Sequence, residues 1–159
     1  MEKPSGVLVG CAECHPQPYR EFMESPHFEA DEEKRPGCVN CHEPHDFFTW
    51  FRYMYRSTPE WEDVQLGLHD NAYWEEEVRP GLAAKARKSF VVAKSKPCKD
   101  CHLKTFKKKV KAHKKKLAEV NDKPEELVCI GCHYNFVHAE VPWSDKKEDI
   151  KKWLESARK

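Results

Sequence analysis

The sequence predicts a mostly α-helical chain with extensive loop and little or no sheet. Three observations lead to this fold class. Hydrophobic residues make up 39% of the 159 residues and charged residues 35%, so the polypeptide alone can bury only a thin core. The segments with helical periodicity are short and are separated by proline or glycine. All eight cysteines occur in pairs with the spacing C-x-x-C, and a histidine follows each pair directly.

These pairs form four CxxCH motifs, the attachment signature of a c-type haem. The two cysteines form thioethers with the haem vinyl groups, and the histidine binds the iron from the proximal side. We therefore expect four covalently bound haem c groups as the core of a small multihaem cytochrome fold. The thioether cysteines are Cys11, Cys14, Cys38, Cys41, Cys98, Cys101, Cys129 and Cys132, and the proximal ligands are His15, His42, His102 and His133.

Paired CxxC motifs also occur in structural zinc sites and in redox-active or disulfide-bonded pairs. None of these sites requires a histidine directly after every pair. Nine histidines placed at random among 159 residues would rarely produce four such coincidences. The haem interpretation is therefore favoured.

Five further histidines are available for the distal faces of the haems: His27, His45, His69, His113 and His138. Four haems need only four distal ligands, so every iron can be six-coordinate and low-spin. A reaction centre needs an open coordination position, so saturated iron favours electron transfer over substrate chemistry. We expect an electron-transfer protein rather than an enzyme, and we assign no catalytic residue.

The motifs indicate an internal duplication. His15 is followed twelve residues later by His27, and His42 three residues later by His45; the corresponding steps from His102 to His113 and from His133 to His138 are eleven and five residues. We expect one compact domain with four parts. These are a first dihaem unit (1–46), an aromatic and helical connector (47–97), a second dihaem unit (98–142) and a C-terminal helix (143–159).

Two helices are expected before the third motif. Tyr19, Phe22 and Met23 indicate one or two helical turns that lead to Ser25-Pro26-His27, which places His27 on the following loop. Residues 81–94 are expected to form a helix stopped by Pro97, whose inward side chains are Leu82, Ala86, Phe90 and Val91.

Two more helices are expected after the third motif. Residues 103–119 should be helical because four side chains share one face, namely Phe106, Val110, His113 and Leu117. Residues 144–158 should form a capped helix with four inward side chains, namely Ile150, Trp153, Leu154 and Ala157.

Two surfaces allow more than one interpretation. The lysines around His113 are most simply a solvated face, with docking of an acidic partner as the alternative. The aromatic cluster at 47–55 is most simply a helix covering haem faces, with a subunit interface or a membrane-surface contact as the alternatives. The formal net charge of +1 does not indicate a nucleic-acid binder.

We expect no signal peptide or membrane span in this chain, because the longest apolar run near the start is Val7-Leu8-Val9. Haem c is attached outside the cytoplasmic membrane. The expected location is therefore extracytoplasmic, either periplasmic or extracellular, and the protein is expected to be secreted.

Several motifs resemble the NapC/NrfH family of tetrahaem quinol dehydrogenases: Cys11-x-x-Cys14-His15, Ser25-Pro26-His27, Cys41-His42-Glu43-Pro44-His45-Asp46 and Cys132-His133-x4-His138. The resemblance implies that His27 serves the fourth haem, His113 the second and His138 the third. We expect two departures from the family, the absence of an N-terminal membrane helix and Gln17 at a position where methionine is frequent. The symmetry of the two units points to His45 for the first haem, with His69 as the alternative.

The chain is also similar in size and motif count to extracellular tetrahaem cytochromes that polymerise into conducting filaments. Some of these borrow a distal histidine from a neighbouring subunit, a role open to His69. The expected function is electron transfer as a soluble carrier between redox partner proteins. The alternatives are a subunit of an electron-conducting filament, in which the chain partners itself as a homopolymer, and a component of a quinol- or nitrogen-compound-linked oxidoreductase.

Overall fold

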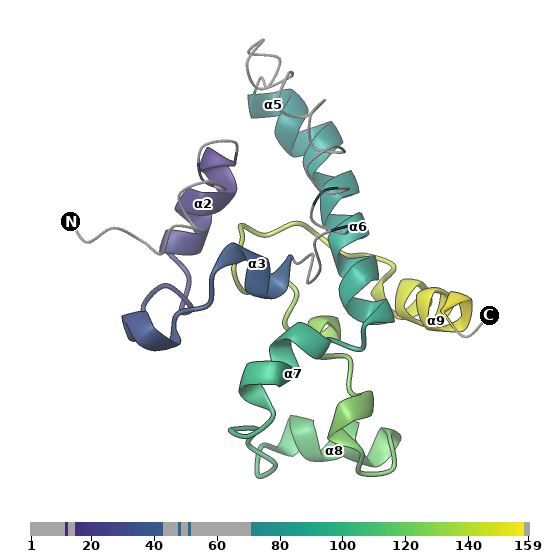
Figure 1. Ribbon diagram of the computed structural model, residues 1–159. Coiled ribbons are helices and arrows are strands. Elements are labelled where there is room, and N and C mark those ends of the chain that lie inside the picture. The colour runs from purple at the N-terminus through teal and green to yellow at the C-terminus, as the bar shows by residue number, and fades with distance from the viewer. Residues whose placement is uncertain (1–11, 13–14, 43–47, 49–50, 52–70, 158–159) are drawn as a thin grey trace. The chain divides into compact units, whose positions relative to one another are not determined.

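The computed structural model describes Ala12 and residues 15–42, 48, 51 and 71–157. These residues form helices and loops, and no strand occurs among them, which confirms the predicted fold class (Figure 1). The elements in chain order are α2 (Pro16–Met23), η1 (Glu32–Lys34), α3 (Cys38–Cys41), α5 (Asn71–Tyr73), η2 (Trp74–Val78), α6 (Arg79–Val92), α7 (Lys96–His102), α8 (Lys111–Glu119), η3 (Pro124–Glu126), η4 (Cys129–Gly131) and α9 (Lys146–Ser156).

The chain divides into two compact units. Unit 1 contains Met1–Pro80 and Asn135–Val141, and unit 2 contains Gly81–Tyr134 and Pro142–Lys159. Both units are therefore discontinuous in sequence. The dihaem units predicted from the sequence, 1–46 and 98–142, are groupings of motifs along the chain and not these compact units. That grouping stays a prediction.

In unit 1, α2 begins directly after the first motif. Pro16 lies in its first turn, where a missing backbone N–H costs nothing. The buried Phe22 packs edge-on against Phe28, with ring centres 5.6 Å apart. The Arg35 guanidinium lies 4.2 Å from the centre of the Phe28 ring. These contacts turn the chain back after α2 and leave His27 on the loop, as predicted.

A helical run extends from α5 through η2 to α6. The middle element η2 is a π-helix, in which the Arg79 N–H donates to the Trp74 carbonyl. Pro80 follows directly, and its ring cannot donate the hydrogen bond of a regular α-helix. The wider π-turn accommodates this defect. Helix α6 therefore begins at Arg79, two residues before the predicted start.

The end of α6 also differs from the prediction, because the helix stops at Val92, two residues before the predicted end at Lys94. Lys94 and Ser95 are left-handed, with φ of 48° and 54°. The Ser95 N–H donates to Phe90 O at 2.7 Å and the Lys94 N–H to Val91 O at 2.9 Å, which is a Schellman motif. Pro97 instead lies in the first turn of α7.

The helix predicted over 103–119 is shorter than expected. Helix α8 begins at Lys111, and Val110 before it is extended and 41% exposed. The lysines that precede α8 place positive charge at a helix N-terminus, where the helix dipole disfavours it. The inward positions of His113 and Leu117 are confirmed, whereas that of Val110 was wrong.

An aromatic cluster holds the C-terminal part of unit 2. Trp143 stacks on Trp153 of α9 and donates through its Nε1 to Asp149 at 2.8 Å. The buried Arg87 guanidinium lies 5.2 Å from the Tyr134 ring centre and 5.0 Å from that of Trp143. Ile150, Trp153 and Leu154 are half-buried as predicted, but Ala157 is exposed because it follows the end of α9. The expected side-chain cap is also wrong, since Asp145 precedes α9 without a capping hydrogen bond.

The apolar core is thin. Among the described residues only four hydrophobic side chains are buried, Phe22, Val91, Leu117 and Val141. This agrees with the thin core expected from the composition. Within the described part of the chain, none of the helices is long and apolar enough to cross a bilayer.

Candidate haem-binding sites

The three CxxCH motifs that the structure describes each contain a helical turn. The second motif forms α3, where the His42 N–H donates to Cys38 O at 2.9 Å. The third lies within α7, and in the fourth the His133 N–H donates to Cys129 O at 3.0 Å. Residues three apart in a helical turn lie on the same side. Each pair of cysteines can therefore reach the same haem edge, with the histidine directly after it.

The cysteines of these motifs are chemically suited to thioether formation. Cys38, Cys41, Cys98, Cys101, Cys129 and Cys132 form no disulfide, and all are half-buried or exposed. The donor set of two thiols and one imidazole in each motif therefore fits haem c. In the first motif, Cys11 and Cys14 lie outside the described residues, as do the predicted ligand His45 and its alternative His69.

The third and fourth motifs are joined within unit 2. Ser95, before the third motif, is completely buried, and its Oγ accepts the N–H of Ile130 at 3.2 Å from inside the fourth. Lys99 donates through Nζ to the carbonyls of Lys94 and Glu125. Burial is the main cause that lowers the pKa of Lys99. These contacts fix the two haem-attachment turns relative to each other.

Unit 2 also brings His113 close to the fourth motif. The ring centres of His113 and His133 are 6.4 Å apart, and Phe106 stacks on His113 at 4.5 Å. The Nδ1 of His113 lies 3.2 Å from the Lys107 carbonyl. Because a carbonyl only accepts, Nδ1 carries the proton, and the lone pair is on Nε2. His113 is thus in the tautomer that can bind a metal through Nε2.

Unit 1 gathers other predicted ligands. The rings of His42 and His138 lie 5.9 Å apart, and His27 packs edge-on against Phe136 at 5.0 Å. Desolvation, followed by the nearby His138 and His15, lowers the pKa of His42 to about 4, although part of this residue is exposed. His42 is therefore neutral at physiological pH, which is the form that binds metals. The three distal pairings implied by the resemblance each join residues of different units, and they stay predictions.

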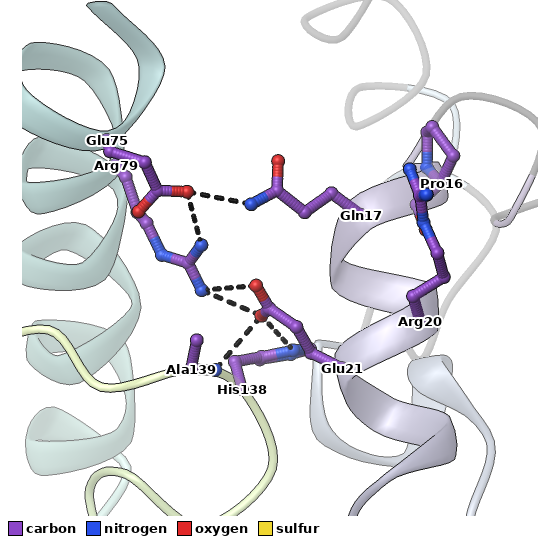
Figure 2. Close-up of polar contacts among 8 residues, drawn as sticks. All are labelled: Pro16, Gln17, Arg20, Glu21, Glu75, Arg79, His138 and Ala139. Atoms are coloured by element: carbon purple, nitrogen blue, oxygen red, sulfur yellow. Dashed lines mark hydrogen bonds and ion pairs between the residues drawn. The ribbon is translucent and has the colours of Figure 1, made fainter. Parts of the chain in front are cut away.

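A polar network next to His138 has no counterpart in the sequence prediction (Figure 2). Glu21 of α2 accepts hydrogen bonds from Arg79 and from the Ala139 N–H. Arg79 also donates to Glu75 at 2.8 Å, and Glu75 accepts from Gln17 at 2.7 Å. Glu21 and Arg79 are 58 residues apart, so no local pattern could have revealed their contact.

The network changes the proton affinities of its members. Burial opposes the charge of Arg79, but the hydrogen bonds that Arg79 donates to Glu21 and Glu75 raise its pKa above the usual value. Burial lowers the pKa of His138; Arg79 acts in the same direction, whereas Glu21 and the Pro18 carbonyl oppose it. His138 therefore stays neutral beside a largely shielded ion pair.

The model of the NapC/NirT cytochrome c family, N-terminal region, matches residues 6–143. The chain belongs to this family. Membership establishes a c-type cytochrome that binds haem and transfers electrons to redox partners. The attachment of haem c takes place outside the cytoplasm.

Several curated relatives of this NapC/NirT family chain cover most of its length. The cytochrome c-type protein NapC of Escherichia coli (strain K12) is 25% identical over 142 residues, which cover 87% of this chain and 70% of NapC. The denitrification system component NirT of Stutzerimonas stutzeri is 26% identical over 146 residues, 89% of this chain and 70% of NirT. A probable tetraheme cytochrome c-type of Nitrosomonas europaea is 30% identical over 148 residues, 88% of this chain and 61% of the relative. No solved structure matches the chain significantly.

Proposed function

We propose that this NapC/NirT family cytochrome is an extracytoplasmic electron carrier with four low-spin haem c groups. The four CxxCH histidines are the proximal ligands. His27, His113, His138 and His45 are the distal ligands, with His69 as the alternative to His45. The haems supply the electron-accepting chemistry, and the chain attaches them, supplies both axial ligands and sets their surroundings.

The observation that carries this proposal is the surplus of histidines over motifs and its agreement with the fold. Four motifs are accompanied by five further histidines. Two of these lie near motif histidines, His138 beside His42 and His113 beside His133. His113 is also held in the tautomer with its lone pair on Nε2. The surplus of histidines supports six-coordinate iron, which suits electron transfer rather than substrate binding.

The test is the haem content and spin state of the holoprotein, produced with a c-type maturation system. We expect four haems per chain by pyridine haemochrome assay and only low-spin ferric signals in the electron paramagnetic resonance spectrum. Fewer haems would contradict the motif assignment. A stoichiometric high-spin signal would contradict complete axial ligation and favour an enzyme with an open iron site.

Sedimentation of the same preparation tests the carrier role. We expect a discrete particle of the size of one haem-loaded chain, because a carrier must diffuse between its partners. Long polymers of uniform width would contradict the soluble carrier and favour the electron-conducting filament. His69→Ala would then be the variant to examine, since loss of the polymer would identify a ligand shared between subunits.

A further inference from the structure

The carboxylate of Glu21 lies directly beside the ring of His138. Its Oε2 is 3.6 Å from His138 Nδ1, and the same oxygen accepts the N–H of the next residue, Ala139, at 3.0 Å. Figure 2 shows both contacts converging on one side chain from α2. Glu21 therefore contacts both the backbone and the imidazole of this segment.

Arg79 holds this carboxylate in place. Its Nη2 lies 2.7 Å from each oxygen of Glu21, and its Nη1 donates to Glu75. The side chains of Arg79 and Glu21 are only 12% and 14% exposed. A charge-assisted pair with so little water around it is less mobile and less screened than a surface ion pair. The negative charge of Glu21 is therefore fixed next to His138.

Two acceptors face the imidazole of His138, namely the Glu21 carboxylate near Nδ1 and the Pro18 carbonyl. His138 Nδ1 is buried and makes no hydrogen bond within the described part of the chain. When Nε2 binds iron, the proton of the imidazole lies on Nδ1, and the carboxylate of Glu21, which only accepts, is placed to receive it. At 3.6 Å the contact is electrostatic, and a shift of less than about 1 Å would make it a hydrogen bond.

We propose that Glu21, fixed by Arg79, is a positioning residue that orients His138 and lowers the reduction potential of the haem it binds. The inference rests on the proposed function in one respect, namely that His138 is an axial ligand. A carboxylate facing the outer nitrogen of a metal-binding histidine fixes its orientation and makes it a stronger donor. Stronger donation and a nearby negative charge both favour ferric over ferrous iron.

The decisive variant is Glu21→Gln in the full holoprotein. Glutamine keeps the length and an oxygen acceptor for Ala139 but removes the charge. Spectroelectrochemical titration should show one haem whose reduction equilibrium shifts by about tenfold towards the ferrous form, about 59 mV for one electron. Four low-spin haems should remain, and the low-spin signal of that haem should move as its ligand becomes a weaker donor.

Glu24→Gln is the matched control, because it removes the same charge from an exposed position three residues further along the same segment. Its four potentials should match those of the unaltered protein. If Glu21→Gln also leaves all four potentials unchanged, the positioning role is overturned. If Glu21→Gln fails to bind four haems, Glu21→Asp tests the same point, since it keeps the charge but draws it away from Nδ1; an unchanged titration would then overturn the proposal.

His138→Ala separates this inference from the ligand assignment. A high-spin haem in His138→Ala together with unchanged potentials in Glu21→Gln overturns only the role of Glu21. Four low-spin haems in His138→Ala overturn the ligand assignment, and the role of Glu21 with it. A high-spin haem in the first variant and one shifted potential in the second support both.

Discussion

At the scale of single residues, His113 is the predicted distal ligand with the best-defined geometry. Its Nδ1 faces the Lys107 carbonyl at 3.2 Å, and Phe106 stacks on its ring. His113→Ala should convert one haem of four to the high-spin ferric form, because alanine offers iron no donor atom. Electron paramagnetic resonance of the oxidised holoprotein measures the spin state.

Lys107→Ala is the control, because it keeps the backbone carbonyl and should retain four low-spin haems. If His113→Ala also retained four low-spin haems, His113 would be a packing residue and not a ligand.

Loss of the Ser95 hydroxyl should weaken unit 2. Ser95 is completely buried, and its Oγ accepts the Ile130 N–H. Ser95→Ala should destabilise the holoprotein by about 1–3 kcal/mol, because a buried N–H loses its partner. The thermal unfolding midpoint should fall accordingly. Ser89→Ala is the control, since its exposed hydroxyl bonds only within α6; equal midpoints for the two variants would contradict the role of Ser95.

The sequence predicted the residues of the site that follow a local pattern. Each CxxCH motif spans five positions and is visible without the fold. Glu21 and Arg79 could not be predicted, because an acidic and a basic residue 58 positions apart carry no signal in a chain that is 35% charged. The same holds for Ser95 and Ile130, whose hydrogen bond joins residues 35 positions apart.

At the scale of elements, apolar periodicity predicted where helices occur but not where they end. Val110, His113 and Leu117 fit one helical face, yet the helix begins only at Lys111. The apolar periodicity does not report the unfavourable interaction between several lysines and the dipole of a helix N-terminus. The end of α6 was equally hidden, because left-handed Lys94 and Ser95 are not the glycine that usually marks a Schellman motif.

The N-terminus of α8 should be open to stabilisation. Val110 occupies the N-cap position without a side-chain hydrogen bond and is largely exposed. Val110→Asp should stabilise the holoprotein by about 1 kcal/mol, because aspartate can accept a free N–H of the first turn and offsets the nearby lysines. The thermal midpoint should rise. Val110→Ala supplies no acceptor and should not raise it; if both variants gave the same midpoint, the missing cap would not limit α8.

At the scale of the whole molecule, the lysines around His113 form a face with a high local positive charge, here called the lysine face. Its eight members are all exposed: Lys104, Lys107, Lys108, Lys109, Lys111, Lys114, Lys115 and Lys116. If this face guides acidic partners, hexacyanoferrate(III), a small anion, should oxidise the reduced holoprotein several-fold more slowly as ionic strength rises. Stopped-flow absorbance of the haems measures the rate.

The charge-reversal variant Lys108→Glu/Lys109→Glu should slow this reaction at low salt. Lys151→Glu/Lys152→Glu on α9 makes the same change in net charge at two exposed lysines elsewhere. A larger effect of the first pair assigns guidance to the lysine face. Equal effects would show that only net charge matters and would leave the lysines as a solvated surface.

Composition and motifs predicted the fold class because a chain with few apolar residues and four haem-attachment motifs must use the haems as its core. Composition does not predict which segments of the chain belong to which compact unit. Residues 135–141 begin two positions after His133 of the fourth motif, yet they belong to the unit of the first two motifs. Only contacts distant in sequence, such as that of Ala139 with Glu21, decide this membership.

The interleaving of the units has a practical consequence for anyone who wishes to dissect the protein. The chain passes from one unit to the other after residues 80, 134 and 141, so a single peptide-bond cleavage cannot release either unit as a whole. A gene fragment ending after residue 80 would lack the segment 135–141, which carries His138. A fragment starting at residue 81 would contain this segment but not Glu21 and Arg79. If the two halves arose by duplication, the N-terminal half does not encode the whole of unit 1, because residues 135–141 come from the C-terminal half.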